Sequence, residues 1–287
     1  MPDPYLGRMS QTQTTAQRPA LFDRLALARH RARAARDPAL FLQEAVADDI
    51  EDRIAEVNRS FNDVSVVTPW PDLWAARLPR ARIVADAETL DLVPASQDLV
   101  IHALALHWAE DPIGQLIQCA RALRPDGLLI ATLFGGETLA DLRAALTAAE
   151  TAVTGGLSPR VAPMGEIRDL GALLQRAGLA LPVADGTPYD VSYETPFHLM
   201  RDLRAMGESN AMVHRLRRPT RRAVLAEAAR LYAETNARPD GRVGARFEVI
   251  TLTGWAPSAD QPQPLRPGSA TRSLEEALRR ARDDSAD

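Results

Sequence analysis

The sequence contains no lysine. All 34 positively charged side chains among its 287 residues are arginine. This absence excludes a Schiff-base lysine, a lysine general base and the lysine of a phosphate-binding P-loop. The codon usage of a GC-rich genome, which favours arginine and alanine, is sufficient to explain the bias.

Cysteine and histidine are also scarce. The single cysteine, Cys119, excludes an intramolecular disulfide and a zinc site built from several thiolates. The five histidines have neither HExxH nor H-x3-H spacing, so the sequence predicts no metal site.

Long hydrophobic runs and a strong net charge are absent as well. No run of 18 apolar residues predicts a membrane span, and the polar residues 1–18 contain no apolar signal core. We therefore expect a disordered start and, by elimination, a cytoplasmic location. A net charge of −4 gives no indication of nucleic-acid binding.

The central part of the chain alternates between strand and helix patterns, within a globular composition of 46% hydrophobic and 25% charged residues. Apolar runs predict strands at residues 64–67, 81–86, 98–106 and 128–134. Between and after them we expect helices at residues 71–78, 111–124 and 138–153, and a turn at 125–127. This alternation is typical of a doubly wound α/β sheet.

Further helices and strands flank this core. The basic residues 19–36 predict a helix, either solvated or a surface for an acidic partner, and a second helix starts with Asp37 as N-cap and Pro38 in the first turn. The second half predicts a helix at 165–177, strand material at 181–193 broken by Gly186 and Pro188, helices at 196–206 and 219–235, and a strand at 246–255.

Four stretches carry a resemblance to a known family. Residues 97–136 read QDLVIHALALHWAEDPIGQLIQCARALRPDGLLIATLFGG, which resembles the second half of class I S-adenosylmethionine-dependent methyltransferases. More specific are GGLSPRVAPMGEIRDLGALLQRAGL (155–179), DLRAMGESNA (202–211) and RPGSAT (266–271). Together they resemble the methyltransferase-like family of complex I assembly factors, whose mitochondrial member is an arginine hydroxylase acting on a complex I subunit. They are similar, more distantly, to the malonyl-carrier-protein methyltransferases of biotin synthesis.

The resemblance covers about residues 22–271. It implies a Rossmann-like methyltransferase sheet with helices on both faces, and S-adenosylmethionine as cofactor. We expect a methyltransferase-like domain over residues 19–257 with a helical insert at about 196–236 before the last strand. A flexible tail with a short helix from Ser273 is expected at 258–287.

The sequence departs from this family where the cofactor loop belongs. The first strand should end in a D-x-G-x-G-x-G-like loop, because glycines let the backbone approach the methionine part of the cofactor. Here no glycine lies between Val64 and Leu106, and TPWPDLW follows the strand. Trp70 and Trp74 are interpreted either as plugs of the old crevice or as platforms for a ligand.

One strand-helix unit is also missing, since only about twenty residues separate Val64 from Asp86. Without it the first strand would have an unpaired edge, so we predict that residues 81–86 pair with residues 64–67. Asp86 would then stand near the place of a ribose-binding carboxylate.

Candidate site residues follow the third strand. His107 ends it at the carboxyl edge, where open α/β sheets bind ligands. We consider Ala103, Leu104 and His107, with Asp86, as cofactor-binding positions, and His102 as structural.

A second group of candidates lies elsewhere in the chain. The candidate catalytic residues are Glu208 and Asn210 of the GESN stretch, together with His107. Alternatively, Glu208, Ser209 and Asn210 only cap the preceding helix and form a turn. Arg160 can hold a carboxylate bidentately or form a surface ion pair. Gly135-Gly136 predicts a tight turn.

Three functions are compatible with these observations. The first is S-adenosylmethionine-dependent methyl transfer. The second, which the missing glycines favour, is a repurposed or non-catalytic member that binds a protein, such as a respiratory-complex subunit. The third is a protein-arginine hydroxylase-like enzyme, for which the sequence shows no two-His-one-carboxylate spacing.

Overall fold

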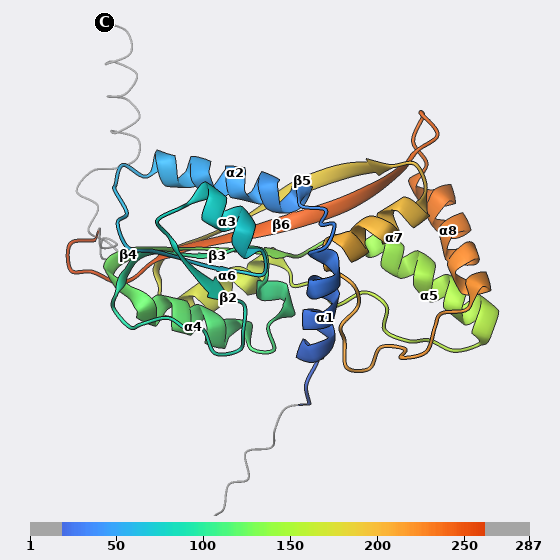
Figure 1. Cartoon of the computed structure of the whole chain (residues 1–287), viewed down its shortest axis with the longest axis horizontal. Helices are drawn as coiled ribbons and strands as arrows, with labels where there is room; N and C mark the ends of the chain where they lie inside the picture. Colours follow the sequence, from blue (N-terminus) through green and yellow to red (C-terminus); the bar gives the residue numbers. More distant parts are fainter. Residues whose placement is uncertain (1–18, 262–287) are drawn as a thin grey trace, which may run out of the picture.

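The computed structural model describes residues 19–261 and contains one mixed sheet with helices on both faces (Figure 1). Six strands form the sheet: β1 (Val64–Thr68), β2 (Arg82–Ala85), β3 (Gln97–His102), β4 (Leu123–Phe134), β5 (Ala180–Tyr193) and β6 (Val243–Trp255). The helices are α1 (Arg24–Ala34), α2 (Phe41–Glu56), α3 (Pro71–Arg77), α4 (Pro112–Ala122), α5 (Ala140–Thr154), α6 (Ile167–Arg176), α7 (Pro196–Ala205) and α8 (Arg222–Asn236). The expected Rossmann-like α/β class is confirmed.

The strand order is β2-β1-β3-β4-β6-β5. The first four strands are parallel, while β6 runs antiparallel to both β4 and β5. In the β1–β2 pair, Val66 lies opposite Ile83 and Val67 opposite Val84. The predicted pairing of residues 81–86 with residues 64–67 is therefore confirmed. β2 occupies the position beside β1 that the missing strand would otherwise take.

Alternation along the central strands fills two hydrophobic layers. Val66 faces the core beneath α2, where Leu42, Val46 and Ile50 are buried. Val67, its neighbour, faces the opposite layer, which α4 and α6 cover. This period-two pattern explains why parallel strands buried on both faces read as continuous apolar runs.

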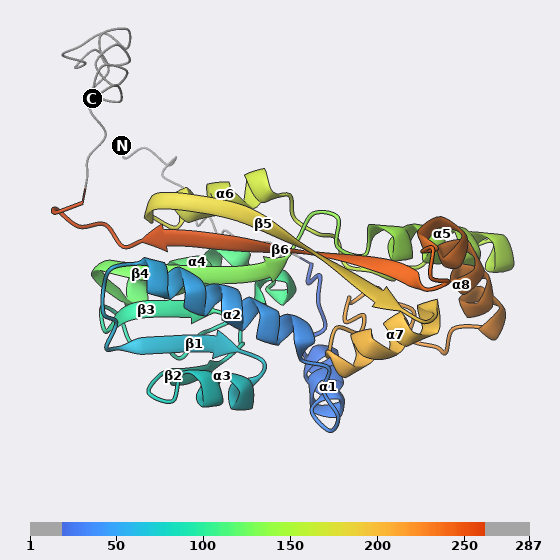
Figure 2. The ribbon, with the colours of Figure 1, turned by 90° about the horizontal axis from the view of Figure 1, so that it is seen from above.

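The antiparallel β5–β6 pair is much longer than the other strand pairs and carries the sheet beyond the doubly wound core (Figure 2). Helices α5, α7 and α8 pack around its far end, and α7 and α8 lie between β5 and β6 in sequence, as expected for the helical insert. The predicted break of the strand at Gly186 and Pro188 is wrong. Because β5 is an edge strand, Pro188 needs no ladder hydrogen bond on its outer side.

Three sequence-based boundaries also need correction. Asp37 does not cap α2, which begins at Phe41 after Leu40. The third strand stops at His102; Leu104 adopts φ 43° and a 3-10 turn follows at Leu106–Trp108. The predicted turn at residues 125–127 lies inside β4 as a bulge, with Asp126 at φ 62°.

Helix α1 starts later than residue 19, at Arg24, with the Asp23 side chain accepting a hydrogen bond from the Ala26 amide. It stands against α7 at the edge of the sheet (Figures 1 and 2). The predicted disordered residues 1–18 and the predicted helix from Ser273 lie outside the described residues. In residues 19–261, no helix has the length and apolar character that crossing a membrane requires.

Candidate functional site

His107 and Trp108 lie at the carboxyl end of β3, in the short 3-10 turn that replaces the last part of the predicted strand. The His107 side chain is 5% exposed and packs against the Phe134 ring at the end of β4, with ring centroids 4.9 Å apart. Both residues thus stand at the sheet edge where parallel α/β folds bind ligands.

Glu208 reaches the same place from the end of α7. The helix terminates through Gly207, which has φ 78°, and the Glu208 amide then bonds the Leu203 carbonyl. A Cβ at Gly207 would lie 3.1 Å from the Arg31 Cγ, so both the backbone angle and the space favour glycine here. This turn aims the Glu208 side chain back toward β3.

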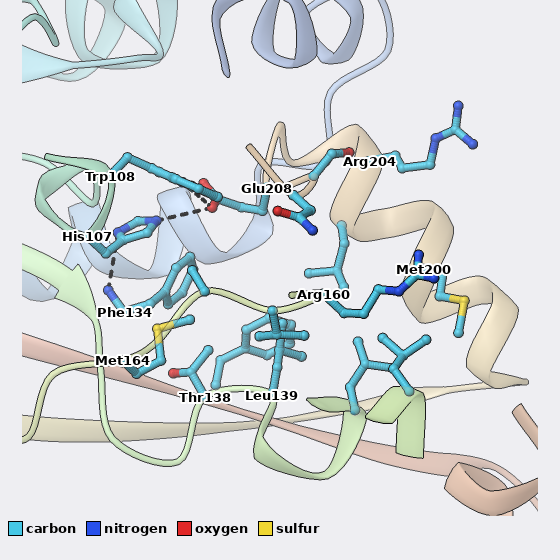
Figure 3. A pocket seen from close by; sticks show the side chains of 18 residues that line it. His107, Trp108, Phe134, Thr138, Leu139, Arg160, Met164, Met200, Arg204 and Glu208 are labelled. Carbon is cyan, nitrogen blue, oxygen red and sulfur yellow. Dashed lines mark hydrogen bonds and ion pairs between the residues drawn. The ribbon is translucent and has the colours of Figure 1, made fainter. Parts of the chain in front are cut away.

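The three side chains form a hydrogen-bonded group (Figure 3). The Trp108 indole donates to Glu208 Oε2 over 2.6 Å, and His107 Nε2 lies 3.1 Å from the same oxygen. The Phe134 amide donates to His107 Nδ1 over 3.4 Å, which places the ring proton on Nε2 and makes His107 a donor to Glu208. Within the described residues, no hydrogen bond is made to the other oxygen, Oε1.

Glu208 keeps its negative charge although its side chain is only 10% exposed. Burial raises the pKa of this carboxyl, but His107, Arg31 and the Trp108 indole lower it more. The net pKa lies below its ordinary value, so the site presents a fixed carboxylate.

A cavity of about 210 Å³ opens beside this group. Its walls come from the ends of β3 and β4, from α5, α7 and β6, and from the loops after α5 and α7. They are mainly apolar. The lining residues are His107, Trp108, Phe134, Thr138, Leu139, Leu142, Leu146, Arg160, Val161, Ala162, Met164, Met200, Leu203, Arg204, Glu208, Ser209, Asn210 and Phe247. An apolar hollow with a few convergent polar groups is the usual form of a small-ligand or side-chain site.

Arg160 and Asn210 line the cavity, but their polar groups form hydrogen bonds within the protein that stabilise the cavity wall. Arg160 forms a bidentate ion pair with the buried Glu150, through Nε at 3.0 Å and Nη2 at 2.6 Å. Asn210 donates to the Pro159 carbonyl and accepts from the Met212 amide. The carboxylate expected for Arg160 is therefore an internal one.

Ser209 stands between these groups with its hydroxyl buried and without a hydrogen bond among the described residues. Together with Glu208 it gives the cavity two polar groups that the surrounding protein leaves incompletely satisfied.

His102, Ala103 and Leu104 do not face this cavity. His102 is fully buried, lies 2.7 Å from the Gln115 side chain, and burial lowers its pKa, in agreement with a structural role. The Ala103 amide donates to the Val67 carbonyl and the Leu104 amide to Thr132 Oγ1, so both amides are used inside the fold.

Asp86 follows β2, and helix α1 covers it. Its side chain is 1% exposed, with Arg31 Nη1 2.5 Å from Oδ2 and Arg24 Nη2 3.4 Å from Oδ1. Burial raises the pKa of Asp86, but the two guanidinium groups lower it more, to below its ordinary value. The position expected to bind a ribose thus binds two arginines of the same chain.

The tryptophans of the TPWPDLW segment are both buried. Trp74 is fully enclosed in the core between α2 and β1, and Trp70 is 7% exposed and packs beneath Gly207. Their positions agree with the interpretation of both residues as plugs.

Comparison with known proteins finds sequence similarity to methyltransferases and to an arginine-hydroxylase. A methyltransferase domain model matches residues 52–131. The mouse mitochondrial arginine-hydroxylase NDUFAF5 is 40% identical over 199 residues, and the malonyl-[acyl-carrier protein] O-methyltransferase of Xylella fastidiosa is 35% identical over 182 residues. These matches support a relationship of the chain to the class I S-adenosylmethionine-dependent methyltransferase superfamily.

These matches leave part of each protein uncovered. The mouse match spans 69% of this chain and 58% of the relative, and the Xylella match spans 63% and 59%. Among solved structures, the YcgJ protein of Bacillus subtilis is 11% identical with a TM-score of 0.44, covering 70% of this chain and 94% of that one. The chain spans less than two thirds of the length of the two curated relatives.

The cofactor named by the superfamily can be tested against the residues present. Pro69 and Pro71 supply no amide hydrogen after β1, and the Trp70 amide donates to Thr68 Oγ1. Trp70 and Trp74 fill space, and the Asp86 carboxylate is closed by Arg31. These residues do not form a cradle for S-adenosylmethionine. As for metals, in the part of the chain that the structure describes no three His, Cys, Asp or Glu side chains gather in a suitable cluster.

The structure brings four residues that the sequence suggested separately, His107, Glu208, Asn210 and Arg160, to one cavity. The sequence did not predict that α1 closes the neighbouring crevice. Phe22 packs edge-on against Trp108, with ring centroids 5.1 Å apart, and Arg31 pairs with Asp86. The available signal was the seven-residue spacing of Arg24 and Arg31, which puts both on one helix face.

Proposed function

We propose that this chain is a protein-binding member of the methyltransferase superfamily that acts in the assembly of a respiratory complex without transferring a methyl group. The observation that carries the proposal is the internal pairing of Asp86 with Arg31 beside the plugged loop after β1. Methyl transfer depends mainly on holding the sulfonium and the acceptor in line, so a fold that cannot hold the cofactor lacks the essential element.

The preserved part of the molecule supports a binding role. Six of the eighteen residues that line the cavity beside His107, Trp108 and Glu208 come from the GGLSPRVAP and GESN stretches, which are distinct from the lost cofactor loop. Because function resides in particular sites on a fold, a chain can lose one site and keep another.

We further propose that this cavity receives an arginine side chain of the partner protein. The relatives at about 40% identity are arginine-hydroxylases by name. In this chain, the apolar walls from Phe134, Leu139 and Leu203 suit the methylene stem of an arginine, and Glu208 Oε1 is available to accept from its guanidinium group. A buried carboxylate of lowered pKa is a suitable counter-charge.

Isothermal titration calorimetry of the whole chain with S-adenosylmethionine tests the absence of cofactor binding. We expect no heat at millimolar ligand, while a class I methyltransferase titrated in parallel gives a binding curve. Micromolar binding would overturn this part of the proposal and favour the active methyltransferase.

Fluorescence anisotropy with a labelled peptide tests the arginine site. The probe carries one central arginine, and its matched control carries citrulline, which has the same shape without the charge. We expect the arginine peptide to bind at least about tenfold more tightly, and Glu208→Gln to abolish the difference. Glu166→Gln, an exposed change outside the cavity, should preserve it. Equal binding of the two peptides to the unaltered chain would refute the arginine site.

A further inference from the structure

The net charge of −4 conceals a strong separation of charge along the surface. Residues 21–36 and 201–222 contain twelve arginines against three acidic residues, a formal excess of nine positive charges. The rest of the chain therefore carries an excess of thirteen negative charges. We call the surface formed by these two segments the basic face.

The two segments of the basic face lie side by side in the fold (Figure 1). The Asp23 amide donates to the Ala211 carbonyl over 2.7 Å, and the Val213 amide donates to the Leu21 carbonyl over 2.9 Å. Arg215 bonds the Asp23 carboxylate at 2.9 Å. Charges separated by almost 200 positions in sequence thus belong to one surface.

Most arginines of the basic face have no carboxylate partner. Arg24 and Arg31 are paired with Asp86, and Arg215 with Asp23. Among the described residues, no ion pair is formed by nine exposed arginines of this face, among them Arg29, Arg33, Arg204, Arg217, Arg218 and Arg221. Guanidinium groups without internal partners remain available for carboxylates, which they bind bidentately.

The basic face adjoins the wall of the cavity at two places. Arg204 lines the cavity, and its side chain extends away from His107 and Glu208 in Figure 3. On the other side, Arg160 in the cavity wall donates to the Thr220 hydroxyl over 2.7 Å, which ties the arginine-rich loop to the wall. The basic face therefore lies beside the cavity that holds Glu208.

We infer that the basic face binds an acidic polypeptide segment, whose carboxylates flank the residue that enters the cavity. This inference rests on the proposed function and names the chemistry of the partner. The positive charge of the basic face would repel a free cationic side chain. A segment with aspartate and glutamate on either side of an arginine fits both features. Its carboxylates pair with the arginines of the basic face, and its arginine pairs with the buried Glu208 carboxylate.

Other anionic partners fit the surface less well. A flat membrane offers no group that enters a concave cavity. The basic face also has only two exposed large apolar residues, Leu21 and Leu25, which could insert into a membrane. A nucleic acid would extend past the basic face, and the excess of thirteen negative charges in the rest of the sequence opposes a long phosphate chain.

Anisotropy with a twelve-residue peptide tests the inference on the whole chain. The probe has six acidic residues around a central citrulline, so that it reports the basic face independently of Glu208, and the control has asparagine and glutamine in place of the acids. We expect the acidic probe to bind at least about tenfold more tightly than the neutral one, and to weaken about tenfold between 50 and 300 mM salt.

Charge-reversal variants test whether the acidic probe binds at the basic face. The triple variant Arg217→Glu, Arg218→Glu, Arg221→Glu should weaken binding of the acidic probe about tenfold. Arg121→Glu, Arg168→Glu, Arg176→Glu makes the same change in net charge at exposed arginines of α4 and α6 and should change binding less than about twofold.

Three outcomes overturn the inference: equal binding of acidic and neutral probes, equal weakening by both triple variants, or tight binding to phosphatidylglycerol vesicles or duplex DNA that the acidic peptide does not displace. If the acidic citrulline probe binds as expected while the arginine and citrulline peptides of the cavity test do not differ, the basic face stands and the arginine site fails.

Discussion

Arg31 of α1 forms a 2.5 Å ion pair with Asp86, which directly follows β2, and so joins the N-terminal helix to the sheet edge where the superfamily holds its cofactor. Both side chains are shielded, with exposures of 14% and 1%. The pair makes α1 part of the domain, although few residues of this polar helix are buried.

Removing one partner of this pair should destabilise the fold. Asp86→Asn leaves two arginines facing a neutral group, and we expect a loss of about 3 kcal/mol in the free energy of unfolding. Asp91→Asn, at a pair whose carboxylate side chain is 89% exposed, should cost less than about 1 kcal/mol. Urea denaturation measures both; equal small losses would show that α1 is not held through Asp86.

The same pair predicts a pH dependence of stability. The folded pKa of Asp86 lies below its ordinary value of 3.8. Its stabilising contribution is therefore complete above that value and is lost as pH falls through the folded pKa. The difference in unfolding free energy between the unaltered chain and Asp86→Asn should be constant from pH 5 to 7 and shrink below about pH 4. A difference that grows on acidification would contradict this assignment.

Trp74 is predicted to be a major core residue. Its side chain is fully buried between α2 and β1, so Trp74→Ala should cost about 3–5 kcal/mol. The exposed Phe197→Ala provides the comparison, with a change within about 0.5 kcal/mol. A small effect of Trp74→Ala in thermal unfolding would mean that the segment after β1 can open and that the crevice is accessible.

Glu150 is expected to organise the cavity wall through Arg160 and Ser158. Glu150→Ala leaves the Arg160 guanidinium without its carboxylate, and we expect faster amide hydrogen exchange in residues 155–162 together with a loss of about 3 kcal/mol. Glu137→Ala, an exposed change nearby, should leave exchange in this loop unaltered. Unchanged exchange in Glu150→Ala would show that the loop is held by other contacts.

The sequence was sufficient for the central sheet because each strand is a run of apolar residues with few alternatives. The β1–β2 pairing followed from the cost of an unpaired edge. Local patterns failed where distant residues decide the structure. Pro188 looked like a break, and only its place at the sheet edge makes it compatible with a long strand. Asp37 looked like a cap, but α2 begins at Phe41, three residues after Pro38.

The candidate site was also predictable only in part, because some of its contacts are made by residues distant in sequence. His107 could be placed because strand ends meet at one edge of a parallel sheet. The ion pair of Asp86 with Arg31 could not be predicted. In the sequence, an arginine of a polar helix looks the same whether its side chain faces water or a buried carboxylate. Only their seven-residue spacing distinguishes Arg24 and Arg31, and many solvated helices share that spacing.

The burial of Cys119 has a practical consequence for studying contacts. It is the single thiol of the chain, is fully buried on the inner side of α4, and burial raises its pKa to about 12. At neutral pH it should hardly react with maleimides. A cysteine introduced at an exposed position of the basic face would then be labelled selectively, so a crosslinker or spin label can be placed there without first removing a native residue.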